Sequence, residues 1–167
     1  MQMQSLNDLF EHEIADLYSA ETQLVEALPK MAQAASNEEL KTAFQHHLEE
    51  TRDHVRRLEE IRGQLGSSMD ETCDGMKGLI SEGEETIEAD GDPTVKDAAL
   101  IAAAQRVEHY EIAAYGTART LASELELREA QELLDQTLDE ESNADKLLTK
   151  IATGGMFKAG LNQQAAQ

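Results

Sequence analysis

The sequence has few of the residues that build sheets or crosslinks. It contains no tryptophan, one cysteine, two prolines and only 4% aromatic residues among its 167 residues. Because strands favour aromatic and β-branched residues in alternating patterns, and no such alternation is present, a sheet sandwich is disfavoured. The single cysteine, Cys73, excludes an intrachain disulfide framework and a zinc site made of several thiolates. This cysteine usage predicts a reducing compartment, the cytoplasm.

Positive charge and long apolar runs are also scarce. Fourteen Lys and Arg residues stand against 34 Asp and Glu residues, so the formal net charge is -20. A polyanion repels nucleic acids and anionic lipids at long range, and we expect neither as a partner. No stretch approaches the roughly 20 consecutive apolar residues of a membrane span, and Met1–Ser5 lacks the cationic and apolar character of a targeting signal.

Strong helix formers dominate the sequence, and apolar residues recur at steps of three and four. The first such stripe runs from Leu6 to Met31 after a cap at Ser5, with Asp8 three residues further on. Pro29 is expected to kink or tighten the last turns of this helix. A second stripe begins after the break at Ser36–Asn37 and ends at Gly66.

The second half of the chain repeats this layout after a long connection. Residues 67–92 contain four glycines and a weak helical rhythm, which predicts a short helix within the connection. Asp92–Pro93 then signals the start of a helix that ends near Leu121, and a fourth helix is expected over residues 127–151. Two helical hairpins joined by a long connection are typical of a one-crossover bundle.

The sequence therefore predicts an all-α fold, a ferritin-like antiparallel four-helix bundle with a long crossover that contains a short extra helix. We expect the bundle domain to occupy residues 1–152. Gly154–Gly155 should stop the last helix, which leaves residues 153–167 as a flexible C-terminal tail.

Each helical stripe is interrupted near its middle by an acid where the spacing predicts an apolar residue. These acids are Glu21, Glu50, Glu111 and Glu141. Burying them together in ionised form, without compensation, would exceed the roughly 5–15 kcal/mol stability of a domain. Two divalent cations bridged by carboxylates remove this cost, as in other bundle cores. Oxygen ligands with an imidazole favour iron or manganese and do not separate the two metals.

The spacing of the acids also repeats between the two hairpins. Glu21 and Glu50 are 29 residues apart, and Glu111 and Glu141 are 30 residues apart. His54 follows Glu50 by four residues, and Asp145 follows Glu141 by four, so each pair shares a helix face. This pattern predicts two similar half-sites, one with an imidazole and one with a carboxylate in its place.

Several assignments stay open at this point. Glu108 can replace or join Glu111, because it lies one turn earlier, and Glu140 competes with Glu141. His47 can hold a ligating carboxylate from outside the site. For any acid taken alone, a solvated surface position is the simpler interpretation. The candidate metal ligands are Glu21, Glu50, His54, Glu108, Glu111, Glu141 and Asp145.

Three stretches resemble the bacterial YciF/YciE family, a ferritin-like group of stress-associated proteins also called the DUF892 family. They are Tyr18–Glu21, His47–Thr51 and above all Ala102–Glu111, and the resemblance covers nearly the whole chain. It implies a ferritin-like fold, homodimers and a di-metal centre, with no defined biochemical activity. Ferritin-like sites usually contain Glu-x-x-His, whereas this sequence offers Glu50-x-x-x-His54 and Glu141-x-x-x-Asp145.

Two functions are consistent with these features. In the first, a reduced pair of iron or manganese ions reacts with dioxygen or peroxide and protects the cell under stress. In the second, the chain is a non-enzymatic structural or interaction protein that keeps the ferritin-like scaffold without a functional metal and docks to a protein partner. Metal content separates these two hypotheses.

Overall fold

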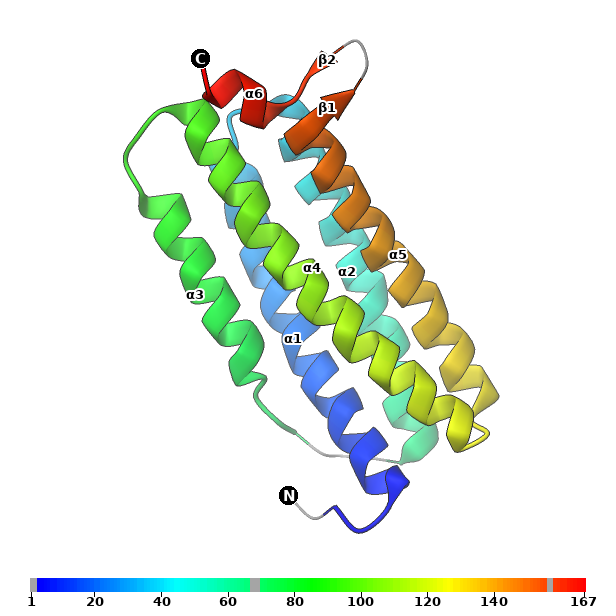
Figure 1. Cartoon of the computed structure of the whole chain (residues 1–167). Coiled ribbons are helices and arrows are strands. Elements are labelled where there is room, and N and C mark those ends of the chain that lie inside the picture. The colour runs from blue at the N-terminus through cyan, green and yellow to red at the C-terminus, as the bar shows by residue number, and fades with distance from the viewer. Residues whose placement is uncertain (1–2, 67–69, 156–157) are drawn as a thin grey trace.

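The structure, a computed structural model, describes residues 3–66, 70–155 and 158–167. Four long helices form an antiparallel bundle, and a shorter helix lies in the connection between its two halves (Figure 1). The long helices are α1 (Leu6–Ala34), α2 (Glu38–Leu65), α4 (Pro93–Glu124) and α5 (Arg128–Thr153), and the shorter one is α3 (Asp74–Glu88). The predicted all-α, ferritin-like architecture with a helical crossover is therefore confirmed.

The helix ends follow the local signals in the sequence. The Ser5 side chain accepts a hydrogen bond from the Asp8 backbone, and the Asp8 side chain accepts one in return from Ser5, so the two form a capping box. Asn37 caps α2 in a similar way, and Gly66 ends that helix in the left-handed region with φ 63°. Pro29 lies within the last turns of α1, and the helix continues past it as far as Ala34.

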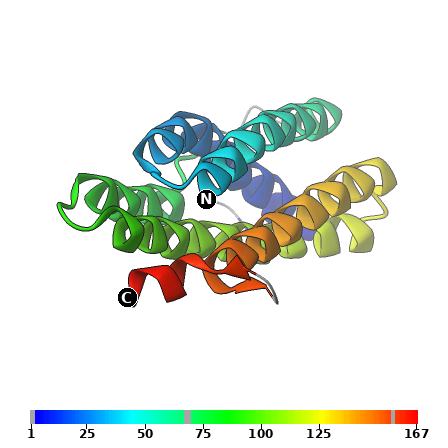
Figure 2. The same cartoon turned by 90° about the horizontal axis from the view of Figure 1, so that it is seen from above.

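The crossover sets the direction of the second hairpin. In Figure 1, α2 runs down the bundle, α3 carries the chain back up, and α4 runs down again beside α1. Seen from above, α1 and α2 form one layer, while α4 and α5 form the other, with α3 packed beside α1 and α4 (Figure 2). Within the described residues, no helix is both long and apolar enough to cross a membrane.

The apolar core is divided into two clusters along the bundle axis. One cluster contains Leu24, Phe44, Leu100 and Leu148, among others. The second cluster includes Phe10, Leu58, Tyr115 and Leu134. Every long helix contributes to both clusters, and the predicted acids lie on the segments between them. The fold thus places a polar layer between two apolar halves of the core.

Residues beyond α5 pack against the end of the bundle. The strand β1 (Gly154–Gly155) pairs antiparallel with β2 (Lys158–Ala159), and the short helix α6 (Leu161–Ala165) contacts α4. Leu161 is buried within the first apolar cluster. A Cβ atom at Gly160 would lie 2.3 Å from the Ala152 carbonyl oxygen, so this close return of the chain requires glycine. The sequence predicts a flexible tail here and gives no sign of this packing.

Asp97 joins the first hairpin to the start of α4. Its buried carboxylate accepts hydrogen bonds from the Ser36 backbone at 2.8 Å, the Ser36 hydroxyl at 2.6 Å and the Asn37 backbone at 2.9 Å. These contacts satisfy the donors of the turn between α1 and α2, next to the cap of α2. One anionic side chain therefore fixes how the two hairpins meet at this end.

Replacing this carboxylate should destabilise the bundle. We expect Asp97→Ala to lower the free energy of unfolding by about 2–3 kcal/mol, because three donors lose a charged acceptor in a buried turn. Urea unfolding of the metal-free protein measures the change. Asp90→Ala, at an exposed position before α4, is the matched control and should stay within about 0.5 kcal/mol of the parent. Equal stabilities for the two variants would contradict the role of Asp97.

Candidate metal centre

The polar layer consists of six buried side chains contributed by all four long helices. Helical spacing directs them inward, since each follows or precedes a core residue by three or four positions. The six are Glu21 from α1, His47 and His54 from α2, Glu108 and Glu111 from α4, and Glu141 from α5. Their exposed fractions are 5% or less.

His54 connects two of the carboxylates with one ring nitrogen. Its Nδ1 atom lies 2.9 Å from Glu141 Oε1 and 3.2 Å from Glu21 Oε1. Neither contact meets the geometric criteria of a hydrogen bond. Its Nε2 atom lies 2.9 Å from Glu140 Oε2, outside the cluster. The Nδ1 edge of the imidazole therefore faces the buried acids, and the Nε2 edge is held by Glu140.

The anchor of His54 is itself held by Arg57. The guanidinium donates to both oxygens of Glu140, at 2.6 and 3.0 Å, and also to the Thr137 hydroxyl at 2.9 Å. Although burial opposes ionisation, these hydrogen bonds lower the pKa of Glu140 to about 2. Because an ionised carboxylate only accepts hydrogen bonds, His54 Nε2 is the donor in this contact and Nδ1 faces the cluster. A cation bound at Nδ1 would displace the proton there. Such carboxylate–histidine pairs orient the imidazole ligands of many metal sites.

His47 repeats this arrangement two helical turns earlier. Its Nε2 atom lies 3.4 Å from Glu108 Oε1 and 3.6 Å from Glu141 Oε2, within the cluster. Its Nδ1 atom lies 3.5 Å from Glu50 Oε2, near the surface. The two imidazole centroids are 6.3 Å apart. Each imidazole is thus placed between an outer carboxylate and the buried acids.

Eight buried polar atoms of the cluster have no hydrogen-bond partner among the described residues. They are Glu21 Oε2, His47 Nε2, His54 Nδ1, Glu108 Oε2, both carboxylate oxygens of Glu111 and both of Glu141. The buried hydroxyl of Tyr115 does satisfy one carboxylate oxygen, since it donates to Glu21 Oε1. Unpaired buried carboxylates are costly, so this concentration indicates a site for cations or protons.

Burial and mutual repulsion determine how the acids ionise without metal. Desolvation raises the pKa of Glu21, and it raises the pKa values of Glu108 and Glu111 well above the ordinary range, with the Glu141 charge adding to the effect. Glu141 behaves in the opposite way, because the charges of His47 and His54 outweigh its burial and lower its pKa.

The imidazoles respond to the same acids. Burial favours their neutral form, but Glu108 and Glu141 raise the pKa of His47 to about 10, and contacts with Glu141 and Glu21 raise the pKa of His54 to about 11. Without metal, the layer is therefore balanced by protons on both imidazoles and on Glu108 and Glu111, whose pKa values are raised well above the ordinary range. Cations that bind here must displace these protons.

The ligand atoms fall into two groups that share one residue. His47, Glu108, Glu111 and Glu141 form one group, and Glu21, His54 and Glu141 form the other; within each group the ligand atoms lie within 4.8 Å of one another. Glu141 belongs to both groups. Carboxylates together with an imidazole form a common ligand set for a metal ion. The residues present in either group therefore fit a metal ion.

Five of the predicted ligands lie together in this layer, and two lie at its edge. Glu21, His54, Glu108, Glu111 and Glu141 belong to the two groups. On α4, both Glu108 and Glu111 lie within the polar layer. On α5, Glu141 lies within the layer and Glu140 lies outside it.

The remaining two predicted ligands, Glu50 and Asp145, are half-buried. The Glu50 carboxylate contacts His46 and His47, and Asp145 accepts a hydrogen bond from Gln105 at 2.9 Å. Coordination by either of these residues stays a prediction.

The helical angle explains why α2 buries His47 more deeply than Glu50. His47, Thr51, His54 and Leu58 follow one another at steps of four, three and four, which is the centre of the buried face of α2. Glu50 lies one position off this line, and its side chain is 27% exposed. The seven-residue step between the two histidines is the signal that identifies His47 from the sequence.

Comparison with known proteins gives the family. A family model described as "Domain of unknown function (DUF892)" matches residues 5–166. The chain is 46% identical over 165 residues to Protein YciF of Escherichia coli (strain K12), a match that covers 98% of this chain and 99% of that protein.

Solved structures agree with this relationship. The crystal structure of the E. coli stress protein YciF matches with a TM-score of 0.83 and 48% identity, over 89% of this chain and 94% of that one. YcfI of Rhodopseudomonas palustris, described as a candidate structural protein, matches with a TM-score of 0.87 and 41% identity, over 90% and 97%. The chain therefore belongs to the DUF892 family and is a relative of the E. coli stress protein YciF.

Proposed function

We propose that the chain is a stress-protective metalloprotein whose bundle core binds two iron or manganese ions and uses them to reduce dioxygen or peroxide. The observation that carries this proposal is the layer of buried carboxylates and imidazoles, in which eight polar atoms have no hydrogen-bond partner among the described residues. Protons can neutralise such a layer, but they do not explain why both imidazoles are anchored from outside. That anchoring supports ligation of cations.

The donor set favours iron or manganese. It offers four carboxylates and two imidazoles, whereas Cys73, whose sulfur contacts the Tyr110 hydroxyl, belongs to neither ligand group. Carboxylates suit manganese and the harder divalent ions, and imidazole suits iron. Two divalent ions that each release one electron supply the pair of electrons that, with two protons, reduces dioxygen to hydrogen peroxide or hydrogen peroxide to two waters.

The protein contributes positions and protons to this reaction. Glu140, held by Arg57, would accept the Nε2 proton of His54 and leave Nδ1 to the cation. Glu141 would contact both ions, because it belongs to both ligand groups. Tyr115 holds Glu21 by a hydrogen bond, and its own pKa is raised well above the usual range by burial and by the Glu21 charge. Tyr115 therefore keeps its proton and acts as a donor. The two apolar clusters exclude bulk water from the layer.

A structural role without metal is the second candidate. It is favoured by the raised pKa values of His47 and His54, which let protons balance the layer, and by the description of the R. palustris relative. In this case the layer would only specify how the four helices align. The two candidates differ in metal content and in the response of stability to pH.

Elemental analysis of protein purified without chelators tests the first candidate. We expect about two iron or manganese ions per chain, as in other carboxylate-rich bundles. Glu141→Gln should reduce the content by more than half, because this residue belongs to both ligand groups. The control is Glu132→Gln, an exposed position on the same helix. Metal well below one ion per chain in the parent, after incubation with ferrous or manganous salt, would overturn the proposal.

The metal-free protein should lose stability as the pH rises from 5 to 9. Unfolded carboxyl groups titrate near 4.3 and unfolded histidines near 6.5, so the native state binds more protons throughout this interval. Each group with a raised pKa then contributes a slope of up to about -1.4 kcal/mol per pH unit. Glu140 and Glu141, whose pKa values are lowered, are ionised in both states above pH 5 and add no slope.

Glu111→Gln isolates one of these contributions. The neutral amide removes a carboxyl group whose pKa is raised well above its usual range, so the slope above pH 5 should flatten by up to about 1.4 kcal/mol per unit. The variant should gain stability without metal and bind metal less tightly. Urea unfolding at several pH values gives the slope, with Glu132→Gln as control. An unchanged slope would show that Glu111 is ionised in the metal-free fold.

A further inference from the structure

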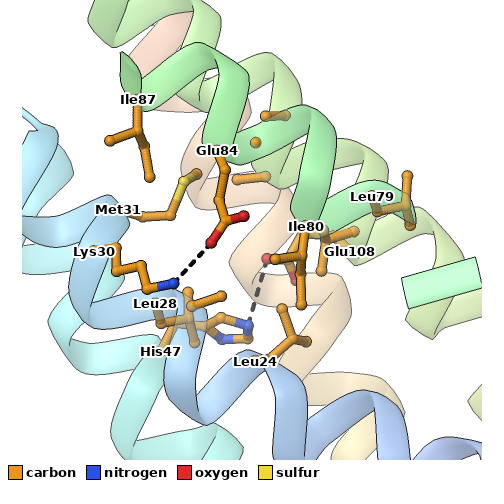
Figure 3. A pocket seen from close by; sticks show the side chains of 15 residues that line it. Leu24, Leu28, Lys30, Met31, His47, Leu79, Ile80, Glu84, Ile87 and Glu108 are labelled. Carbon is orange, nitrogen blue, oxygen red and sulfur yellow. Dashed lines mark hydrogen bonds and ion pairs between the residues drawn. The ribbon is translucent and has the colours of Figure 1, made fainter. Parts of the chain in front are cut away.

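A pocket beneath α3 leads from the surface of the bundle to the candidate metal centre. It is lined by residues of α1, α3 and α4, and it reaches His47 and Glu108 at its inner end (Figure 3). At its outer end Lys30 of α1 and Glu84 of α3 form an exposed ion pair at 2.7 Å. Small molecules in this pocket would therefore lie between solvent and two members of the polar layer.

The walls of this pocket, here called the α3 pocket, are mainly apolar. Ten of its fifteen lining residues carry apolar side chains, among them Leu28, Ile80 and Val107. Of its four charged or imidazole side chains, Lys30 and Glu84 neutralise each other at the mouth, and His47 and Glu108 belong to the centre. The passage between these two ends thus offers no other polar side chain to a ligand.

The size of the α3 pocket limits its occupant. Its volume is about 40 Å³. A single water molecule needs roughly 10–15 Å³ by the same measure, so the pocket accommodates a ligand of very few atoms. An acyl chain or an aromatic ring is too large. An apolar pocket of this size suits a diatomic gas better than water, since water requires two to four polar partners.

A second pocket reaches the same centre from the other side of the bundle. It lies between α2 and α5, has a volume of about 100 Å³, and also ends at His47 and Glu108. Half of its ten lining residues are polar, and they include His46, Glu50 and Asn143. This chemistry suits hydrated or hydrogen-bonding species. The centre is thus approached by the apolar α3 pocket and by a second pocket that has a larger share of polar side chains.

We propose that the α3 pocket is a binding site for dioxygen, which reaches the candidate metal centre by this apolar route, whereas polar species use the pocket between α2 and α5. The proposal rests on the proposed function for the reaction at the centre. Affinity of the α3 pocket for an apolar gas does not depend on metal, because it follows from the size and apolar walls of the cavity. The two proposals can therefore fail separately.

Filling the α3 pocket should block the gas without disturbing the centre. Gly83 lies on α3, and a Cβ atom there would point toward Met31, 4.0 Å from its sulfur. Gly83→Leu places an apolar side chain in the pocket and also improves helix propensity. The matched control is Gly78→Leu on the same helix, where an added Cβ meets nothing within 4 Å. Ala27→Leu fills the pocket from α1 and serves as a second, independent variant.

Two measurements test the proposal. Crystals under xenon pressure should show an anomalous peak in the α3 pocket of the parent and of Gly78→Leu, and no peak in Gly83→Leu. Reduced, iron-loaded Gly83→Leu and Ala27→Leu should consume dioxygen several-fold more slowly than Gly78→Leu at equal iron content. Their peroxide consumption should match that of the control.

The possible outcomes distinguish a failure of the gas-binding proposal from a failure of the proposed metal function. Absence of xenon from the parent pocket, or dioxygen rates in both filled variants equal to the control rate, would overturn the proposal. Equal slowing of dioxygen and peroxide would also overturn it, because the route would then not select an apolar ligand. Xenon bound in a parent protein that retains no metal would refute the proposed function while supporting the affinity of the pocket for an apolar gas.

Discussion

The structure depends on placing charge between two apolar clusters. Four carboxylates and two imidazoles cross the middle of the bundle, and each long helix contributes at least one of them. Bulk water cannot solvate this layer, so its acids must share protons, contact imidazolium groups or bind cations. The outer residues act on this same balance, because Glu140, Arg57 and Glu50 hold the imidazoles from the solvent side. The stability of the fold and any affinity of the layer for cations therefore depend on the same charges.

The sequence predicted the fold well because the relevant signals are local. The capping residues Ser5, Asn37 and Asp92, together with apolar stripes at helical spacing, define the helices without knowledge of their packing. The length of the connection then selects the crossover topology. The presence of a charged layer was also predictable, since Glu21, Glu111 and Glu141 occupy core positions of otherwise apolar stripes. An acid at such a position has few explanations other than a buried site.

The sequence could not decide which neighbouring residue faces inward, because that depends on the angle of each helix against its partners. Glu50 and Thr51 differ by one position, yet Thr51 is fully buried and Glu50 is half-exposed. Glu140 and Glu141 differ in the same way, and only the structure shows that the outer one is clamped by Arg57. The packing of α6 and the pocket beneath α3 arise from contacts between distant segments. Patterns within one helix cannot reveal them.

The composition of α3 has a mechanical consequence. This helix contains three glycines, each of which costs about 1 kcal/mol relative to alanine, and it buries only Met76 and Gly83. Gly75 is required by the nearby Tyr110 ring, whereas Gly78 has open space around it. The covering helix α3 is therefore held by few buried side chains, and brief local unfolding is expected there. Local unfolding of α3 would expose the side of the bundle that it covers on α1 and α4. The four long helices that carry the buried polar layer would keep their packing.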